Sequence, residues 1–502
     1  MEDLPKINSR KRLPVSIPIA DYLRDHVFRG EAVLPAVEAM RILAESSLPY
    51  LEDGAAANIA GADFTRFLHI GPDAEYIEAI NELEFFDQGS VTSKLITMKK
   101  SANSGITRPV KHVSLSFTAP DVSPIEPPLD HTLGLEGIGI KLDKIRIYDE
   151  LIPFKTAYHN IEKVFVSEQG AVAVVSGGSD KATAVPLGSP FPLDASFHAA
   201  CVWGQRFAGM VSFPVHIDQR KIFRKTEPGE TYTCRVIPVK IEAGRLIFDL
   251  WIYSRESELC EEIRGLHMND VSKKTLMPPP WILSSADRRL DPIRAACRDF
   301  SLIELTAVTK PCVKALSPSE LDRFGRMSEK RRTSYLAARL ALKKISRRLS
   351  GHDMGTPACA ITTVKPDGLP ACPLTNGDER FRCTASHDSR FAVAAASEHK
   401  IGIDVEELSE RVLKARHFYM HEDELSLVKS HTLGEVEASA RVWTIKEAVS
   451  KASGMHLADA WQRTRVMEIG SEKSMVLIDD DTHKAIHAVV DGHLITLITI
   501  AA

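Results

Sequence analysis

Two acidic residues stand two positions apart in an apolar stretch of the C-terminal region. The stretch reads Ile-Gly-Ile-Asp-Val-Glu, and its acidic residues are Asp404 and Glu406. Residues two apart in a β-strand face the same side, so the two carboxylates would lie next to each other. Burying them is costly unless a cation neutralises their charge, and Mg²⁺ prefers carboxylate oxygens. The pattern predicts a magnesium site, with an ordinary strand that has one solvated face as the alternative.

A second group of residues with useful chemistry follows in the segment Trp443–Gly454. At helical spacing, Trp443, Glu447 and Lys451 share one face. Glu447 could complete the ligands of the metal, and Lys451, one turn further on, could meet a phosphate. The alternative is an amphipathic helix that carries an ordinary Glu–Lys pair.

Near the N-terminus, the spacing His-x3-Gly-x4-Pro places His26, Gly30 and Pro35 just before a helical pattern. Histidine is the usual side chain for proton abstraction near neutral pH. Glycine permits close approach of the backbone, so the Gly30 N–H could bind a thioester carbonyl. The alternative is a surface histidine beside a turn.

Asp194 and His198 lie one turn apart at the start of another helical pattern, and therefore on one face. The spacing places a carboxyl group and an imidazole together at the start of this helix. The alternative is an aspartate that only caps the N-terminus of the helix.

These residues need elements that position them. Alternating, β-branched runs at 110–117, 163–175 and 247–253 predict strands, and helical patterns at 35–47 and 194–207 interrupt them. The order of strands and helices is that of two copies of a small sheet wrapped around a helix.

The remaining chain changes character after residue 270. Three consecutive prolines within 271–300 predict a linker, which separates a domain over 1–270 from a mixed α+β domain over 301–502. In the latter we expect a long helix over 317–349, which begins at an N-cap serine with proline after it. Strands are predicted at 391–396 and 401–405, and a further helix at 435–452.

Composition limits the class of protein. With 502 residues, 44% of them hydrophobic and 26% charged, and a net charge of −4, the chain suggests two or more globular domains. The composition indicates neither a nucleic acid nor a membrane partner. No stretch approaches the 18 apolar residues that a membrane-spanning helix needs. The first residues lack the apolar segment of a secretory signal, and the eight cysteines show no paired spacing. We therefore expect a cytoplasmic protein with reduced thiols.

The C-terminal motifs resemble a known signature. A Gly-Ile-Asp-Val-Glu strand, followed about forty residues later by Trp-x-x-Lys-Glu-Ala-x-x-Lys, is similar to the phosphopantetheinyl transferase superfamily. Ser386 and His387 stand where that family places a Ser-His pair against the phosphates of coenzyme A. Leu369, between Gly368 and Pro370, replaces a lysine that is usual in the family. The length resembles that of the surfactin-type enzymes, whose single chain carries two pseudo-symmetric halves.

This resemblance implies a holo-[acyl-carrier-protein] synthase, which moves phosphopantetheine from coenzyme A to a serine of an acyl carrier protein. It implies Mg²⁺ held by Asp404, Glu406 and Glu447. Glu447 would also help to deprotonate the serine, while Lys451 and His387 would steady the phosphates. Electrostatic neutralisation of the diphosphate is the main catalytic work in such transfers.

A run of basic residues between Lys330 and Arg348 contains eight lysines and arginines and no acidic residue. It predicts a docking surface for an acidic carrier protein and for nucleotide phosphates. The alternative is a helix with one solvated face. The family places a nucleotide-binding arginine near here, and Arg332 is the candidate.

The N-terminal motifs resemble a different family. His-x3-Gly-x4-Pro followed by Pro-x-x-Leu-Asp-x3-His is similar to the double-hotdog dehydratases of polyketide and polyunsaturated fatty-acid synthases. Segments around Tyr148 and Phe213–Asp218 are similar as well, although the usual Gly-Pro after Tyr158 is missing. The resemblance implies that His26 removes the α-proton of a β-hydroxyacyl thioester. Asp194 would protonate the departing hydroxyl, with His198 orienting it.

The sequence therefore predicts a bifunctional enzyme of fatty-acid or polyketide biosynthesis: a 3-hydroxyacyl-[acyl-carrier-protein] dehydratase fused to a phosphopantetheinyl transferase. The predicted fold is α+β, with two antiparallel sheets each wrapped on a helix, then a pseudo-dimeric C-terminal domain. The partner would be an acyl carrier protein, apo for transfer and β-hydroxyacyl-loaded for dehydration. An alternative is a non-catalytic hotdog module that binds the carrier protein. Isomerisation instead of dehydration, and a homodimer through the hotdog half, stay open.

Overall fold

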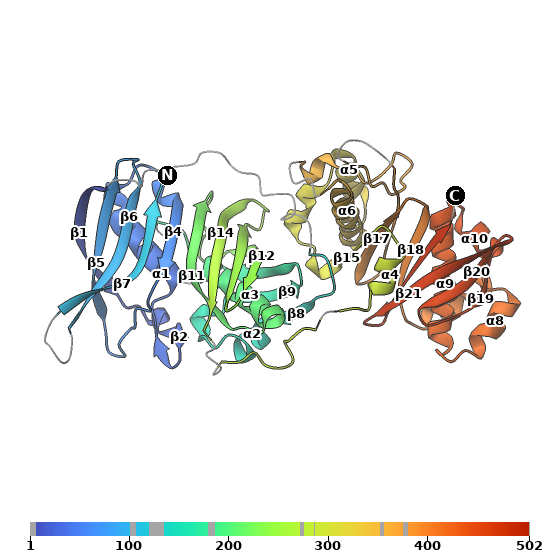
Figure 1. Ribbon diagram of the computed structural model, residues 1–502, viewed down its shortest axis with the longest axis horizontal. Helices are drawn as coiled ribbons and strands as arrows, with labels where there is room; N and C mark the ends of the chain where they lie inside the picture. Colours follow the sequence, from blue (N-terminus) through green and yellow to red (C-terminus); the bar gives the residue numbers. More distant parts are fainter. Residues whose placement is uncertain are drawn as a thin grey trace. The chain divides into compact units, whose positions relative to one another are not determined.

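The computed structural model describes residues 7–100, 107–119, 135–178, 186–271, 276–285, 287–351, 356–374 and 380–500 (Figure 1). The chain divides into two compact units. The first comprises Met1–Glu126 and Gly139–Ser285, and the second comprises Pro127–Ile138 and Ala286–Ala502. Among the described residues, no helix is both long enough and apolar enough to cross a membrane.

In its described residues, the first unit forms a 12-stranded sheet in the order β1-β5-β6-β7-β4-β11-β14-β13-β12-β10-β9-β8. Neighbouring strands are antiparallel throughout. The strands are β1 (Ile7–Pro18), β4 (Asn58–Phe64), β5 (Tyr76–Phe86), β6 (Val91–Lys100), β7 (Thr107–Phe117), β8 (Ile140–Asp143), β9 (Ile161–Ser167), β10 (Gly170–Ser176), β11 (Ser212–Ile222), β12 (Thr231–Glu242), β13 (Arg245–Tyr253) and β14 (Leu259–Asp270).

Each half of this sheet packs against one long helix. α1 (Ala36–Ser47) contacts β1, β5, β6 and β7, and α3 (Phe191–Ala208) contacts β9, β10, β11, β12 and β13 (Figure 1). The prediction of a double hotdog is confirmed, with one difference. The two sheets are continuous, because β4 of the first half pairs with β11 of the second.

α3 is the central helix of the second half. Prolines at its first turn favour the helical start, and Gly209, at φ 63°, ends it in the left-handed conformation. Nearly all of its side chains are buried, as expected for a helix that is apolar around its whole circumference. The predicted strand over 163–175 is a hairpin, β9 and β10, whose turn ends at Gly170.

The second unit contains two sheets. The three-stranded sheet has the order β15-β17-β16, and the five-stranded sheet has the order β18-β22-β21-β20-β19, counted over the described residues. Its strands are β15 (Asp299–Glu304), β16 (Arg382–His387), β17 (Phe391–Ser397), β18 (Lys400–Glu407), β19 (Thr464–Glu468), β20 (Lys473–Ile478), β21 (Asp481–Val490) and β22 (His493–Ile500). Its helices are α4 (Asp291–Ala295), α5 (Pro318–Arg326), α6 (Glu329–Leu349), α7 (Arg411–Tyr419), α8 (Glu422–Lys429), α9 (Glu435–Ser453) and α10 (Leu457–Arg463).

In the described residues, each half of this unit contains a buried lysine–glutamate ion pair. Lys343 of α6 lies 2.7 Å from Glu320, and Lys446 of α9 lies 2.6 Å from Glu424. Both glutamates are the third residue of a short helix and complete a capping box there. The repeat of helix, capping glutamate and buried lysine supports the two pseudo-symmetric halves expected from the sequence.

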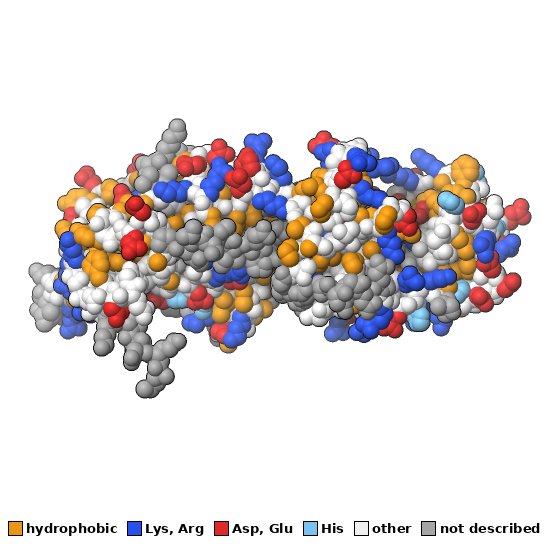
Figure 2. All heavy atoms as spheres, turned by 90° about the horizontal axis from the view of Figure 1, so that it is seen from above, with side chains coloured by type: hydrophobic (Ala, Val, Ile, Leu, Met, Phe, Trp, Pro, Cys, Tyr) orange, Lys and Arg blue, Asp and Glu red, His pale blue; other side chains and the backbone are white. Residues whose placement is uncertain are grey.

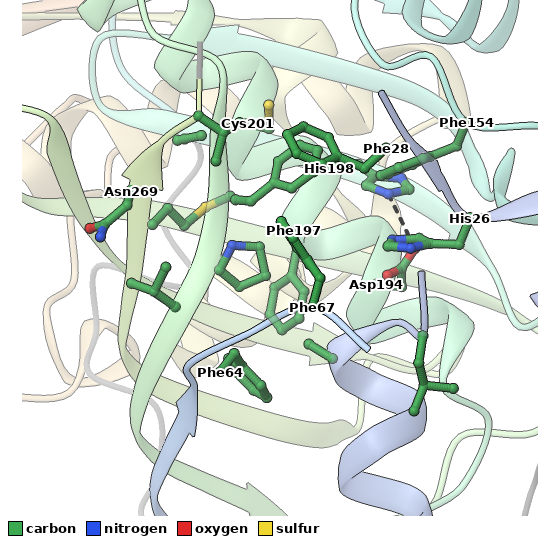
Figure 3. Close-up of a pocket in the computed structure, with 18 of the residues that line it drawn as sticks. His26, Phe28, Phe64, Phe67, Phe154, Asp194, Phe197, His198, Cys201 and Asn269 are labelled. Carbon is green, nitrogen blue, oxygen red and sulfur yellow. Dashed lines mark ion pairs between the residues drawn. The ribbon is translucent and has the colours of Figure 1, made fainter. Parts of the chain in front are cut away.

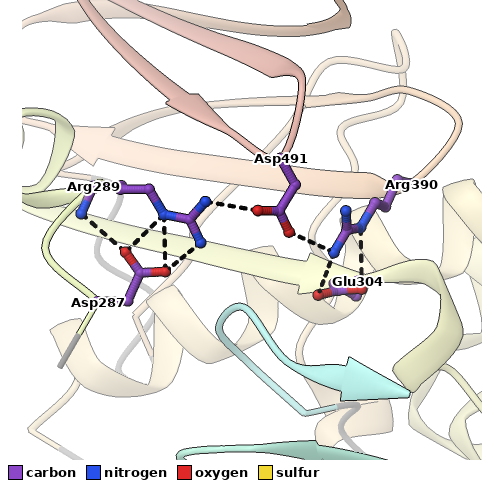
Figure 4. Close-up of polar contacts among 5 residues, drawn as sticks. All are labelled: Asp287, Arg289, Glu304, Arg390 and Asp491. Atoms are coloured by element: carbon purple, nitrogen blue, oxygen red, sulfur yellow. Dashed lines mark hydrogen bonds and ion pairs between the residues drawn. The ribbon is translucent and has the colours of Figure 1, made fainter. Parts of the chain in front are cut away.

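The predicted linker over 271–300 differs from the structure. Residues 272–275 and 286 lie outside the described residues, and in this part of the chain the boundary between the two units falls between Ser285 and Ala286. Within the second unit, Asp491 lies between Arg289 and Arg390 and pairs with both, at 2.6 and 2.8 Å (Figure 4). Residues 287–300 are therefore packed into this unit, because their charged side chains find partners that lie far away in the sequence. The predicted long helix is also interrupted, between α5 and α6.

Candidate active sites

A cavity of about 550 Å³ lies inside the first unit and receives side chains from both halves of the sheet (Figure 3). His26 comes from the segment before α1, and Asp194 and His198 come from α3. The walls are mostly apolar and aromatic. They include Phe28, Phe64, Phe67, Phe154 and Phe197. The three polar residues predicted from the sequence therefore meet in a chamber suited to an acyl chain.

His26 is held as a neutral base. Its Nδ1 lies 3.1 Å from the Val33 carbonyl oxygen, which can only accept, so Nδ1 carries the proton and Nε2 keeps its lone pair. The ring stacks on Phe154 with 4.3 Å between centroids. Burial lowers the pKa of His26 to about 4, against the weaker opposite effect of the Val33 carbonyl. At neutral pH the imidazole is ready to accept a proton.

Asp194 is held as a neutral acid. It lies in the first turn of α3 and is buried among apolar side chains. Burial raises the pKa of Asp194 to about 8, and the negative charge of Glu38 adds to this effect. At neutral pH this carboxyl group carries a proton that it can donate.

His198 follows one turn later and reaches Asp194. Its Nε2 lies 3.1 Å from Asp194 Oδ2, a close contact that is not aligned as a hydrogen bond. Its Nδ1 lies 3.2 Å from the Tyr148 hydroxyl, which itself accepts the N–H of Ile161 at 2.9 Å. Tyr148 therefore donates to Nδ1, which leaves the proton of His198 on Nε2, facing Asp194. Burial lowers the pKa of His198 well below its usual value.

Three supporting residues escaped the sequence analysis. Phe154 forms the surface on which His26 stacks. His159 stacks on Tyr148, with 4.2 Å between centroids, and donates from Nε2 to the Phe154 carbonyl at 2.7 Å. Glu38 is buried beside Arg41, 2.8 Å away, and accepts the Tyr22 hydroxyl. The sequence contained a clue to Glu38, which is a charged residue on the apolar face of a helical pattern. It also contained a clue to His159, which stands where the related dehydratases have Gly-Pro.

Gly30 takes a different place from the one expected. It lies in the tight turn between β2 (Val27–Phe28) and β3 (Glu31–Ala32), with φ 84°, and is exposed. Among the described residues, it does not belong to the lining of the cavity, whereas its neighbour Arg29 does. The turn requires a glycine at this position because the backbone there is left-handed. Gly30 is therefore not placed on the cavity wall, and the binding of a thioester carbonyl by its N–H stays a prediction.

In the second unit, β18 presents Asp404 and Glu406, and α9 presents Glu447 and Lys451. Strand and helix approach closely because of Gly402, where a Cβ atom would lie 1.8 Å from the carbonyl oxygen of Ala448. The glycine of the motif is thus a packing requirement that brings the acidic strand against the helix.

A compact polar cluster follows from this approach. Lys451 Nζ donates to Asp404 Oδ1 at 2.7 Å and to Ser386 Oγ at 2.9 Å. Ser386 Oγ donates to the same oxygen of Asp404, also at 2.7 Å. Both bonds use Oδ1, so the second oxygen of Asp404 can serve another ligand. The structure therefore brings Ser386, Asp404 and Lys451 together.

The negative charges of Asp404, Glu406 and Glu447 are not fully balanced by neighbouring positive charges. Burial, then Asp404, Asp388 and Glu447, raise the pKa of Glu406 to about 7. Burial and Asp404 also raise the pKa of Glu447. An all-oxygen ligand set with excess negative charge fits a hard divalent cation such as Mg²⁺. Within the described residues, these carboxylates do not bring one oxygen each within 4.8 Å of one another, so they would have to close around an ion.

Of the remaining predicted residues, His387 lies near this cluster and Arg332 contacts backbone carbonyls elsewhere. His387, exposed at the end of β16, has its pKa lowered by partial desolvation and by the Lys451 ammonium, so it stays neutral near this cluster. Arg332 lies at the junction of α5 and α6, where it donates to the carbonyl oxygens of Met327 at 3.2 Å and Gly325 at 3.1 Å. Its guanidinium group holds the turn between the helices, and a contact of Arg332 with the nucleotide stays a prediction.

The interpretation of 330–348 as a docking surface is wrong for most of the segment. Arg339, Lys343, Lys344 and Arg347 are buried, and Arg348 pairs with Glu136 and Asp299 of the same unit. Lys330 and Arg331 are exposed. On the face shown in Figure 2, basic and acidic side chains are interspersed and form no single basic patch. The basic residues of this segment thus include both buried side chains and exposed ones.

Comparison with known families agrees with this geometry. Residues 400–498 match the model of the 4′-phosphopantetheinyl transferase superfamily, and residues 152–278 match that of the polyketide synthase dehydratase N-terminal domain. The two matches lie in different compact units of the chain. The first match contains Asp404, Glu406, Glu447 and Lys451. The second contains Asp194 and His198 but not His26.

Individual relatives show more limited likeness. The 4′-phosphopantetheinyl transferase Gsp of Aneurinibacillus migulanus is 37% identical over 83 residues, which are 16% of this chain and 34% of the relative. The match therefore spans about a third of that relative's length. A trans-AT polyketide synthase dehydratase domain of Brevibacillus brevis has 16% identity and a TM-score of 0.43, covering 53% of this chain and 95% of its own. The PpsC dehydratase domain of Mycobacterium tuberculosis has 15% identity and a TM-score of 0.41, covering 53% and 97%.

Proposed function

We propose that the second unit transfers 4′-phosphopantetheine from coenzyme A to a serine of an acyl carrier protein. The supporting observation is that the family match over 400–498 coincides with the packed strand and helix that carry Asp404, Glu406, Glu447 and Lys451. Asp404, Glu406 and Glu447 would hold Mg²⁺, which, when bound, neutralises charge on the diphosphate of the donor.

The residues of this chain have distinct tasks in the transfer. Glu447, whose pKa is raised by burial and by Asp404, accepts the proton of the serine hydroxyl, directly or through water. The serine oxygen forms a bond to the β-phosphorus of coenzyme A as the bond to the bridging oxygen breaks, and adenosine 3′,5′-bisphosphate leaves. Lys451, Ser386 and His387 orient the phosphates. Lys451 is already fixed by Asp404, so little ordering is required when the donor binds.

We propose that the first unit dehydrates β-hydroxyacyl thioesters carried by an acyl carrier protein. The observation that carries this proposal is the opposite perturbation of two groups in one cavity. The pKa of His26 is lowered to about 4 and that of Asp194 is raised to about 8. A neutral base and a neutral acid are the pair that an elimination requires at neutral pH.

The elimination follows from these two states. His26 Nε2 takes the α-proton while Asp194 gives its proton to the β-hydroxyl. The Cα–H and Cβ–O bonds break, the Cα=Cβ bond forms, and water leaves. His26 ends protonated and Asp194 ionised, so one proton must return from His26 to Asp194 before the next turnover. His198 orients Asp194 and, through its Nε2–H, stabilises the carboxylate that forms.

Two assays on the full-length protein test the two proposals separately. Apo carrier protein with coenzyme A and Mg²⁺, followed by intact-protein mass spectrometry, reports transfer. A β-hydroxyacyl thioester, followed by detection of the enoyl product, reports dehydration. Glu447→Gln should abolish only transfer, and His26→Ala only dehydration. A wild-type protein that binds the thioester but forms no enoyl product would instead establish the hotdog half as a binding module.

A further inference from the structure

A group of ionisable side chains lies on the face of the 12-stranded sheet that is opposite the cavity. His216 Nε2 lies 3.0 Å from Asp218 Oδ1, and His267 Nε2 lies 3.5 Å from the same oxygen. His216 Nδ1 lies 2.7 Å from Asp63 Oδ1. Among the described residues, this is the set of three histidine, cysteine or acidic side chains whose ligand atoms all fall within 4.8 Å of one another.

Strand alternation places these side chains together. On β11, Ile217 is buried in the core, so His216 and Asp218 on either side of it face outward. On β14, His267 stands between two buried residues, Leu266 and Met268, and faces outward as well. The strands pair directly, with His216 opposite His267. The two halves of the sheet meet here, because β4, which carries Asp63, pairs with the other side of β11.

Irregularities in the neighbouring strands shape the cluster. β4 shifts its register between Ala60 and Asp63, at Gly61, whose φ is 57°. On β14, Gly265 has φ 59°, and a Cβ atom there would lie 1.9 Å from Asp218 Oδ2. Gly265 therefore provides the room that the carboxylate of Asp218 occupies. Bulges of this kind re-aim side chains, and here they aim a carboxylate at two imidazoles.

The separations match those of a metal site. Zn²⁺ binds imidazole nitrogen and carboxylate oxygen at about 2.0–2.1 Å in a tetrahedron, so its ligand atoms lie about 3.3 Å apart. The distances of 3.0 and 3.5 Å from Asp218 Oδ1 to the two imidazole nitrogens bracket that value. Asp63 accepts the Nδ1–H of His216 and so turns Nε2 toward the site, as a carboxylate commonly does behind a metal-binding histidine.

We propose that His216, Asp218 and His267 bind a borderline divalent cation of the Zn²⁺ class, with water in the fourth position. Two imidazoles and one carboxylate favour Zn²⁺ over Mg²⁺, which prefers oxygen ligands alone. Asp63 is the positioning residue behind His216. This inference does not depend on the activity of either unit.

The site would tie together two neighbouring strands of the second half, β11 and β14, and β11 is the strand that pairs with β4 of the first half. The inward-facing residues of the same strands, among them Phe64, Val215 and Met268, line the cavity. A cation that ties β11 to β14, with Asp63 of β4 behind it, would hold this wall in place. The site is therefore structural and stands outside the chemistry of His26 and Asp194.

The contacts have a second explanation without any metal. A doubly protonated His216 would donate to Asp63 from Nδ1 and to Asp218 from Nε2, and would form the same distances. Zinc titration of the full-length protein, after treatment with a chelator and in competition with a fluorescent zinc indicator, distinguishes the two. Zinc bound at other places, such as the carboxylates of the second unit or the free cysteines, contributes equally to the wild type and the variants. It therefore does not affect the difference between them.

We expect the wild type to bind one Zn²⁺ more than His267→Ala or Asp218→Asn. Asp63→Asn should keep that ion but bind it about 10-fold to 100-fold more weakly, as loss of a supporting carboxylate does. His69→Ala is the matched control, because His69 forms an exposed pair with Glu31 at 2.7 Å without a third ligand. It should bind like the wild type. Equal zinc stoichiometry and affinity in the wild type and His267→Ala would overturn the proposal in favour of the doubly protonated histidine.

Discussion

Replacing Asp194 with asparagine should stabilise the first unit while it removes dehydration. Asp194 has a usual pKa of 3.8 and one of about 8 in the folded protein. Between these values the folded state holds a proton that the unfolded state has lost, so stability contributed by this group falls as pH rises. At about 1.4 kcal/mol per pH unit, the cost is on the order of 2 kcal/mol at pH 5 and 4 kcal/mol at pH 7.

Asparagine removes this pH-dependent cost because it does not ionise. The stability difference between Asp194→Asn and the wild type should therefore grow by about 1.4 kcal/mol for each pH unit between pH 5 and pH 7. A buried amide without a partner adds a penalty of about 1–3 kcal/mol, but that penalty is the same at each pH. The slope with pH is thus the informative quantity, and the absolute difference is not.

Hydrogen exchange followed by mass spectrometry measures this difference, because peptides from α3 report the opening of the first unit separately from the second. Asp73→Asn, at an exposed aspartate of the same unit, is the control and should show no comparable slope. Dehydration by Asp194→Asn should fall about 100-fold or more, since an amide cannot donate the proton. A stability difference that stays constant from pH 5 to pH 7 would refute the assignment of Asp194 as a protonated acid.

Three further outcomes are expected. The rate of dehydration at low substrate concentration should stay level between about pH 4 and pH 8. The rate should decrease at lower pH because His26 gains a proton, and at higher pH because Asp194 loses one. A single pKa near 6.5 in the pH profile would contradict this pair. Glu447→Gln should reduce transfer at least about 100-fold while leaving the second unit folded, as checked by intact mass and calorimetry. Gly402→Ala should lower the stability of the second unit by several kcal/mol, because its Cβ would collide with the Ala448 carbonyl oxygen; an unchanged unfolding temperature would mean that strand and helix separate easily.

Local periodicity was enough to predict which residues share a face. Asp404 and Glu406 are two apart on a strand, and Glu447 and Lys451 are four apart on a helix, so each pair was placed correctly by its own element. Their meeting was not a local property. It depends on the close approach at Gly402, whose place in the motif could be read from the sequence while its contact with Ala448 could not.

The basic segment 330–348 shows why charge is a weak guide to exposure. Lys343 looks like a solvated residue in the sequence, but it pairs with Glu320 in the interior of the unit. Arg348 likewise pairs with Glu136, a residue 212 positions away. A buried charge is tolerated when it is paired and hydrogen-bonded, and its partners are fixed by the tertiary structure. The spacing of lysines and arginines along one helix carries no information about them.

The division of the first site between two halves explains why the pairing of His26 with Asp194 was predicted only through resemblance. His26 precedes α1 in one half, and Asp194 begins α3 in the other. Their pKa values move in opposite directions for one reason, because burial in the same apolar cavity disfavours the charged form of each group. Neither half alone would create that cavity, since its lining comes from both. The pairing of β4 with β11 joins these two halves, and His26 and Asp194 line the same cavity.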